Sequence, residues 1–198
     1  VLKDGYLFIA MGEKTDLQDS AQTLGNHLGK VLRIYDDGRI PKDNPFVDTP
    51  NAKPEIWTYG HRNPNGLALN PATGDLWEHE HGPMGGDELN LIKPGLNYGW
   101  PVITFGLNYD STRVGEGKTA QEGMQQPVYY YKPSIAPSGM QFYTSDVIPA
   151  WKGNVFIGAM ALKHLNRLVL ENNKVIKEER LLIDKKWRVR SVKQGPDG

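Results

Sequence analysis

The 198-residue sequence has no cysteine, no long apolar run and no excess of either charge. Without cysteine the chain can form no disulfide, no thiolate metal site and no cysteine nucleophile. No stretch approaches the roughly 20 consecutive apolar residues of a spanning helix, so we expect no membrane segment. With 23 basic and 23 acidic residues the chain lacks an overall field that would attract nucleic acid. Any anion site must therefore be built locally.

Residues that interrupt helices are abundant. The 22 Gly and 14 Pro, about 18% of the chain, exceed the roughly 12% that these two residues usually contribute. Residues 14–28 are the best helical candidate, and Gly25 keeps any helix there short. Five Trp, nine Tyr and five Phe supply large apolar groups to bury, which excludes general disorder. The composition predicts a turn-rich, folded chain.

A repeated unit runs through the sequence. A glycine turn followed by an alternating apolar strand occurs three times, in residues 4–9, 73–77 and 152–158. Each copy is trailed by a second strand-like run, in residues 29–34, 87–92 and 166–170. Alternation with period 2 in such short runs predicts half-buried antiparallel strands. The interval from Gly153 to Gly198, where a fourth copy begins, matches the roughly 40–45 residues of a four-stranded propeller blade.

The sequence therefore predicts an all-β propeller with long inserted loops. About three and a half blades do not close into a ring and would leave sheet edges unpaired. We expect residues 1–198 to be a fragment of a longer propeller, a cleaved product or one half of an assembly. The alternative is a complete four-bladed propeller with a terminal closing strand.

Residues 59–66 (YGHRNPNG) are the most unusual stretch. Glycines and a proline bracket Arg62 and Asn63, which is how a loop presents polar groups at a fixed place. The alternative is a plain connecting turn with Arg62 in a salt bridge.

Two histidines follow in residues 77–83 (WEHEHGP). On a strand, His79 and His81 point to one side while Glu78 and Glu80 point to the other. A pair of histidines can bind zinc or copper, but two ligands make an incomplete site.

Oxygen ligands and cations form the remaining candidates. The Gly- and Pro-rich residues 82–86 expose carbonyls beside Asp87 and Glu88, and such hard oxygen ligands suit Ca²⁺. Near the end of the chain, Arg188 and Arg190 lie on one face if the segment is extended. Two guanidinium groups suit a ligand with several carboxylates or phosphates, although a solvated edge strand is the alternative. No Gly-rich phosphate loop, G-x-S-x-G elbow or H-E-x-x-H motif occurs, which disfavours a serine hydrolase.

Four motifs occur in a fixed order, in residues 59–66 (YGHRNPNG), 80–90 (EHGPMGGDELN), 95–101 (GLNYGWP) and 187–192 (WRVRSV). The series resembles the soluble PQQ-dependent sugar dehydrogenases, specifically the aldose sugar dehydrogenase group (glucose/sorbosone dehydrogenase-like). Residues 29–46 and 134–140 also fit, so the resemblance spans nearly the whole chain. It implies a six-bladed β-propeller, of which residues 1–198 form one partial domain of three to four blades, truncated at both ends.

The resemblance implies two cofactors, pyrroloquinoline quinone (PQQ) and Ca²⁺, on the top face of the propeller. Arg62 and Asn63 are then expected near the quinone, where the guanidinium would stabilise negative charge that develops on oxygen. The carboxylates of PQQ would be clamped by three cations, Lys163, Arg188 and Arg190. His81, where the glucose dehydrogenase branch has Gln, and Asp87 are expected to contact or adjoin the cofactor.

The implied metal ligands fall in two places. The carbonyls of Gly82 and Pro83 resemble the ligands of a Ca²⁺ that bridges protein and PQQ and polarises the quinone as a Lewis acid. Glu88 and Tyr98 resemble contributors to a second, structural Ca²⁺ site.

The implied activity is oxidation of an aldose at C1 to the lactone, with PQQ as hydride acceptor and a further electron acceptor as partner. The family's general-base histidine lies upstream of the strand that follows Asp4, outside this chain. None of the five histidines matches its position: His27, His61, His79, His81 and His164. The chain alone is therefore expected to be inactive without the remaining blades of its parent.

Other expectations follow from the same resemblance. The family implies a periplasmic or secreted location, a small-molecule sugar substrate, and neither a nucleic-acid nor a membrane partner. Two alternatives stay open. One is a Ca²⁺-dependent propeller lactonase, in which the cations would meet no three-carboxylate cofactor, and the other is a non-catalytic propeller that binds sugar or protein.

Overall fold

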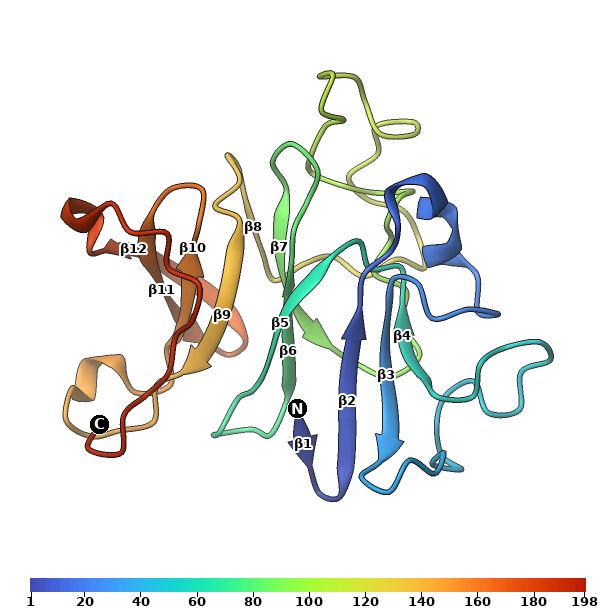
Figure 1. The fold of residues 1–198 in the computed structure, drawn as a ribbon, viewed down its shortest axis with the longest axis horizontal. Helices are drawn as coiled ribbons and strands as arrows, with labels where there is room; N and C mark the ends of the chain where they lie inside the picture. Colours follow the sequence, from blue (N-terminus) through green and yellow to red (C-terminus); the bar gives the residue numbers. More distant parts are fainter.

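The computed structural model describes residues 1–198, with the exception of the side chain of Thr15. The described chain contains twelve β-strands and three short 3₁₀ helices, joined by turns and loops. The strands form three four-stranded sheets in which every pair of neighbours is antiparallel (Figure 1). No helix in this description is long and apolar enough to cross a membrane.

Each sheet uses four consecutive strands in chain order. The first sheet contains β1 (Leu2–Lys3), β2 (Tyr6–Met11), β3 (Lys30–Tyr35) and β4 (Ile56–Tyr59). The second contains β5 (Pro64–Leu69), β6 (Leu76–Glu80), β7 (Asp87–Ile92) and β8 (Tyr129–Tyr131). The third contains β9 (Pro137–Phe142), β10 (Val155–Ala159), β11 (His164–Glu171) and β12 (Lys174–Leu181). The 3₁₀ helices are η1 (Thr15–Gln22), η2 (Pro149–Trp151) and η3 (Ile183–Lys185).

The repeat predicted from the sequence corresponds to the middle of each sheet. The three strands that follow glycine turns are β2, β6 and β10, and the runs that trail them are β3, β7 and β11. Gly5, Gly74 and Gly153 have φ of +78°, +71° and +78°, a left-handed conformation that favours glycine before the second strand. The longer intervals of the repeat hold inserted loops, in residues 36–55 and 93–128, as predicted.

The predicted all-β propeller is confirmed, and the four-bladed alternative is wrong because the described residues form three sheets. The helical candidate at residues 14–28 contains only η1, which is a 3₁₀ helix with non-helical backbone angles at Leu17.

Apolar side chains fill the spaces between successive sheets. Trp77 of β6 meets Phe142 of β9 edge to face, with ring centroids 6.0 Å apart. A second cluster joins Phe8 of β2 to Leu76 of β6 and to Tyr98 of the long loop. Because each sheet packs face to face with the next, the three sheets are successive blades of one propeller, side by side in Figure 1.

The antiparallel order places several loops at one edge of the blades. The β4–β5 loop (residues 60–63), the β6–β7 turn (81–86), the β8–β9 loop (132–136) and the β10–β11 turn (160–163) leave their strands at this edge. We call it the upper edge. The glycine turns of the repeat lie at the opposite, lower edge.

Candidate functional site

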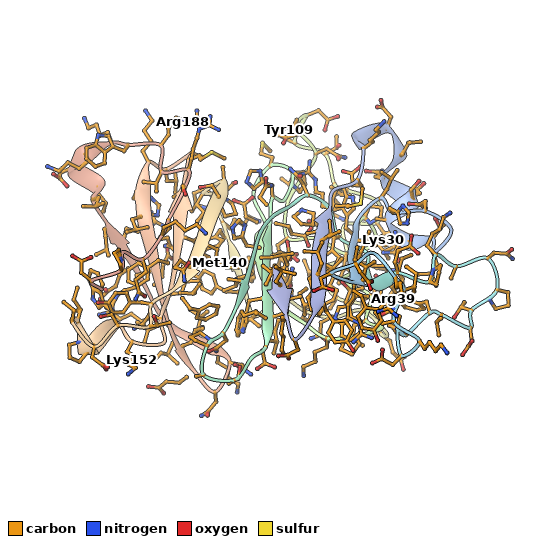
Figure 2. The ribbon with its side chains drawn as sticks, turned by 60° about the horizontal axis from the view of Figure 1, so that its bottom comes forward. Lys30, Arg39, Tyr109, Met140, Lys152 and Arg188 are labelled. Carbon is orange, nitrogen blue, oxygen red and sulfur yellow. The ribbon has the colours of Figure 1, made fainter. Side chains whose placement is uncertain are left out.

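The upper edge gathers most of the residues that the motifs predict. Figure 2 shows Arg188 and Tyr109 at this edge, while Lys152 lies at the lower edge. The gathering follows from topology, since alternate connections of an up-and-down sheet share one edge. Segments as distant in sequence as residues 60–63 and 188–190 therefore border one surface.

Arg62 is fixed over the β6–β7 turn. Its Nη1 donates hydrogen bonds to the carbonyl oxygens of His81 (3.0 Å) and Gly82 (2.9 Å). Its guanidinium carbon lies 5.2 Å from the ring centroid of Trp100, a cation–π distance. Within the described chain Arg62 forms no salt bridge, and its Nε is buried without a hydrogen-bond partner. The salt-bridged turn considered from the sequence is therefore not the arrangement observed, and Nη2 of Arg62 also makes no hydrogen bond within the described chain.

The backbone of the same loop is held by Glu80. The amide of Asn63 donates to the Glu80 carboxylate at 3.2 Å, and the amide of Arg62 donates to the same oxygen. Asn63 itself is exposed. A buried carboxylate thus sets the loop that carries the predicted quinone-side pair.

Asp87 organises the β6–β7 turn. Its side chain is fully buried and accepts hydrogen bonds from the amides of Gly82 (3.0 Å), Ile135 (2.9 Å) and Ala136 (2.9 Å), and from the Ser134 hydroxyl. These contacts tie the turn to the β8–β9 loop. The visible role of Asp87 is to shape the site, and its direct contact with a cofactor stays a prediction.

His79 and His81 point to the same side of β6, as their alternation predicts, and this side faces the third blade. Nε2 of His81 lies 2.6 Å from the carbonyl oxygen of Pro137, and Nε2 of His79 contacts the carbonyl of Ser138. Burial lowers the pKa of His79 to about 4, so this ring is neutral at neutral pH. The two rings bind backbone carbonyls and do not form a two-histidine metal site.

The predicted cationic clamps also reach the upper edge. Lys163, Arg188 and Arg190 are exposed, and none has a salt-bridge partner among the residues that the structure describes. The carbonyl of Arg190 accepts a hydrogen bond from the Gly139 amide at 2.9 Å. Residues 187–194 are irregular, so the arginines are not held on a strand. The segment nevertheless lies along the start of β9, because the Ser138 hydroxyl also donates to the carbonyl of Val189 at 2.6 Å.

A cavity of about 730 Å³ opens beside the β6–β7 turn. Its lining includes His81, Gly82, Pro83, Ser134 and Tyr109. This volume falls within the roughly 300–1,000 Å³ that is typical of small-molecule sites. Sequence reasoning missed Ser134 and Tyr109. The Tyr109 side chain is 74% exposed, and no local pattern marks it.

Glu88 and Tyr98 line a separate, much smaller cavity of about 10 Å³, room for about one water-sized sphere. The Tyr98 hydroxyl is already engaged, since it donates to the Leu91 carbonyl (2.6 Å) and accepts from the Lys93 amide (3.0 Å). The hydroxyl therefore already has a donor and an acceptor within the protein, and the role of Tyr98 at a metal stays a prediction. Burial and nearby Glu80 raise the pKa of Glu88 well above its usual range, as expected of a carboxyl that lacks a counter-cation.

Three propeller blades that carry a cavity and exposed cations at their upper edge define the class of protein: a β-propeller with a candidate site on the face formed by its inter-strand loops. The sequence profile described as Glucose / Sorbosone dehydrogenase matches residues 1–198, and the chain belongs to this family.

Relatives support the same assignment. The chain is 47% identical over 195 residues to the aldose sugar dehydrogenase YliI of Escherichia coli K12, covering 98% of this chain and 52% of that protein. A crystal structure of a glucose dehydrogenase superposes with TM-score 0.95 at 49% identity, covering 99% of this chain and 57% of that one. The PQQ-bound aldose sugar dehydrogenase of Streptomyces coelicolor superposes with TM-score 0.73 at 29% identity, covering 98% and 50%.

The chain therefore spans about half the length of the relatives that it matches. Three blades in about half the length of such a protein agree with a propeller of six blades. Three is also the lower limit of the three to four blades predicted for this chain.

Proposed function

We propose that the protein containing this chain is a PQQ- and Ca²⁺-dependent aldose dehydrogenase that oxidises a sugar at C1 to the lactone. In this proposal residues 1–198 are one partial propeller domain that supplies much of the cofactor site. The general base and the remaining blades come from other parts of the protein. Export to the periplasm or the medium, which the family resemblance implies, belongs to the same proposal.

One observation carries the proposal. Lys163, Arg188 and Arg190 lie without salt-bridge partners within the described chain, at the edge where Arg62 overlies the β6–β7 turn. Exposed cations gathered at one edge fit a ligand with several carboxylates, and PQQ carries three. The Nη2 group of Arg62, which makes no hydrogen bond within the described chain, fits a hydrogen-bond acceptor on the same ligand.

The β6–β7 turn fits the predicted Ca²⁺ as well. The Gly82 carbonyl accepts one hydrogen bond from Arg62, and a carbonyl oxygen has a second lone pair for a metal. Gly82 is required there, because a Cβ would lie 2.2 Å from the carbonyl oxygen of Gly85. Asp87, held at the turn by backbone amides, fixes the direction of these carbonyls.

The chemistry divides between cofactor and protein. When bound, PQQ supplies an ortho-quinone that accepts the two electrons and the hydrogen from C1, with Ca²⁺ as a Lewis acid. In this chain, Arg62 would stabilise negative charge on the ligand beside it, and the three cations would hold and orient the carboxylates. His81, tethered to Pro137 through Nε2, would border the sugar or the cofactor from the cavity wall.

The proposal is tested by titrating PQQ into the protein in the presence of Ca²⁺ or of a chelator. Quinone absorbance and melting temperature report binding, and dye reduction with added aldose reports activity. We expect Ca²⁺-dependent binding that raises the melting temperature, together with aldose-dependent dye reduction. Failure of the folded protein to bind PQQ would overturn the proposal, and lactone hydrolysis without PQQ would then identify the lactonase alternative.

A further inference from the structure

A buried polar cluster lies beneath the upper edge, on the side of β6 that faces away from the histidine pair. Glu78 and Glu80 of β6, Asn90 of β7 and His61 of the β4–β5 loop are 0 to 3% exposed. The proposed function assigns no role to Glu78, Glu80 or His61. Burying this many polar groups costs stability unless each finds a partner.

The carboxylates of the cluster converge on one amide nitrogen and have few other hydrogen-bond donors around them. Nδ2 of Asn90 lies 3.1 Å from a Glu78 oxygen, 3.3 Å from a Glu80 oxygen and 3.4 Å from a Glu88 oxygen. No lysine or arginine in the described chain forms a salt bridge with any of these three acids. Burial and the neighbouring Glu80 raise the pKa of Glu78 well above its usual range. Two backbone amides also donate to Glu80, but the fully buried Glu78 has the Asn90 amide as its one hydrogen-bond donor in the described chain, which leaves its charge poorly compensated.

The imidazole of His61 is directed into the same cluster. Its Nδ1 lies 3.5 Å from Glu80 Oε1 and 3.9 Å from Glu78 Oε2, yet it has no hydrogen-bond partner. The ring is held from outside by Thr58, whose Oγ1 is 2.8 Å from Nε2, and by Tyr98, stacked at 4.6 Å between centroids. When Nε2 carries the proton and donates it to Thr58, Nδ1 presents a lone pair to the cluster, as in histidines that ligate metals.

The spacing of these atoms suits a metal ion. One ligand atom each from His61, Glu78 and Glu80 lies within 4.8 Å of the other two. Metal–ligand bonds of about 2.0–2.2 Å place tetrahedral ligands roughly 3.4 Å apart, close to the two distances from Nδ1. Two other atoms of the cluster also lack hydrogen-bond partners, Oε1 of Glu78 and Oδ1 of Asn90. Turning the Asn90 amide by 180° would direct Oδ1 toward the acids as a further ligand.

We propose that His61, Glu78 and Glu80 bind one divalent cation of the borderline class, Zn²⁺ or Mn²⁺. The nitrogen donor favours such ions over Ca²⁺, which prefers oxygen ligands alone. The site is distinct from the carbonyls of Gly82 and Pro83. It adjoins the small cavity of Glu88 and Tyr98, which Glu80 also lines, but its other two ligands, His61 and Glu78, do not line that cavity.

Such an ion would act on the upper edge through Glu80. One Glu80 oxygen lies in the cluster, while the other accepts the amides of Arg62 and Asn63. A cation that fixes the Glu80 carboxylate therefore also fixes the loop that carries Arg62. The metal would have a positioning role and would not touch the sugar.

The test compares the wild-type protein with Glu78→Gln, which keeps the shape of the side chain and removes its charge. Glu178→Gln is the matched control, because Glu178 is a partly buried acid of β12 bonded to Tyr129 and Asn166, outside the cluster. Protein stripped with a chelator is titrated with Zn²⁺, Mn²⁺ or Ca²⁺, and bound metal is measured by elemental mass spectrometry together with the melting temperature. We expect one equivalent of Zn²⁺ or Mn²⁺ that raises the melting temperature, at least tenfold weaker binding in Glu78→Gln, and wild-type binding in Glu178→Gln.

Two results would overturn the inference. One is a wild-type protein that binds neither Zn²⁺ nor Mn²⁺, so that the buried acids hold protons instead. The other is equal binding by Glu78→Gln and wild type. If Glu78→Gln does not fold, X-ray absorption on the loaded wild type decides the question, because the site requires one nitrogen ligand and a shell of oxygens alone contradicts it. None of these readouts depends on PQQ, so the outcome is independent of the proposed dehydrogenase activity.

Discussion

Replacing Asp87 should unfold the predicted cofactor turn more strongly than any other single change at the upper edge. Three backbone amides and one hydroxyl donate to its buried carboxylate. A buried donor left without a partner costs about 1–3 kcal/mol, so Asp87→Ala should lower the unfolding free energy by about 4 kcal/mol after partial relaxation. Asp87→Asn retains one acceptor oxygen and should lose about half as much.

Denaturant titration of the variants tests this reasoning. The control is Asp110→Ala, since Asp110 accepts hydrogen bonds only from Thr112 in an exposed turn and its loss should not change the midpoint measurably. Asp87→Ala should also weaken PQQ binding in the proposed holoenzyme, because the Gly82 amide loses its anchor. A loss below about 1 kcal/mol in Asp87→Ala would refute the argument, since water or a shifted loop would then satisfy the three amides.

Three further predictions concern charge, pH and space. Arg188→Ala should weaken PQQ binding about 10- to 150-fold in a spectroscopic titration, whereas Lys152→Ala at the lower edge should leave it unchanged. Burial lowers the pKa of Lys30 to about 8 from an ordinary 10.5, so the unfolded chain binds the extra proton between these values. The unfolding free energy should then rise with pH, by about 2 kcal/mol from pH 7 to 9.5, and a Lys30→Met variant that lacks this rise would confirm the source. Gly86→Ala should destabilise more than Gly123→Ala in thermal melts: both have positive φ (+70° and +80°), but only at Gly86 does a Cβ meet backbone, 2.4 Å from the Gly106 nitrogen. Equal losses in the two glycine variants would contradict the steric argument.

The fold was predictable where the signal is local. The second strand of each blade alternates apolar residues directly after a glycine turn, the third strand trails it, and all six formed as predicted. The first strands were not recognised, because β5 (PNGLAL) and β9 (PSGMQF) begin with residues typical of turns. Pro64 and Pro137 are tolerated because each is the first residue of its strand. The glycines leave room for close neighbours, as at Gly139, where a Cβ would lie 2.7 Å from the Val192 nitrogen. β12 was missed for another reason, since its mostly charged side chains form the exposed outer strand.

The motifs predicted which residues belong to the site, but they predicted only part of the contacts between those residues. The resemblance identified the residues of the upper edge, and the alternation of β6 gave the two directions of its side chains. The cluster of His61 with Glu78 and Glu80 was not predicted, because it depends on where the β4–β5 loop packs against β6, a contact that no spacing encodes. The burial of Lys30 was equally hidden. Its ammonium donates to the carbonyls of Ser20, Ala21 and Leu28, which come from η1 and the loop after it.

The buried acids of the described chain, Glu78, Glu80 and Asp87, all belong to the second blade, and two of them lie on β6. All five residues of the strand are buried, so neither face meets water. One face carries Trp77 and His79 against the third blade, and the other carries Leu76, Glu78 and Glu80 against the first blade and the long loop. If stability alone determined the sequence of β6, we would expect aliphatic side chains at positions 78 to 80, because burying a carboxyl group lowers the free energy of unfolding and burying an apolar group does not. The cost is retained at the strand end that borders Arg62 and the β6–β7 turn, as expected of residues that serve the proposed site.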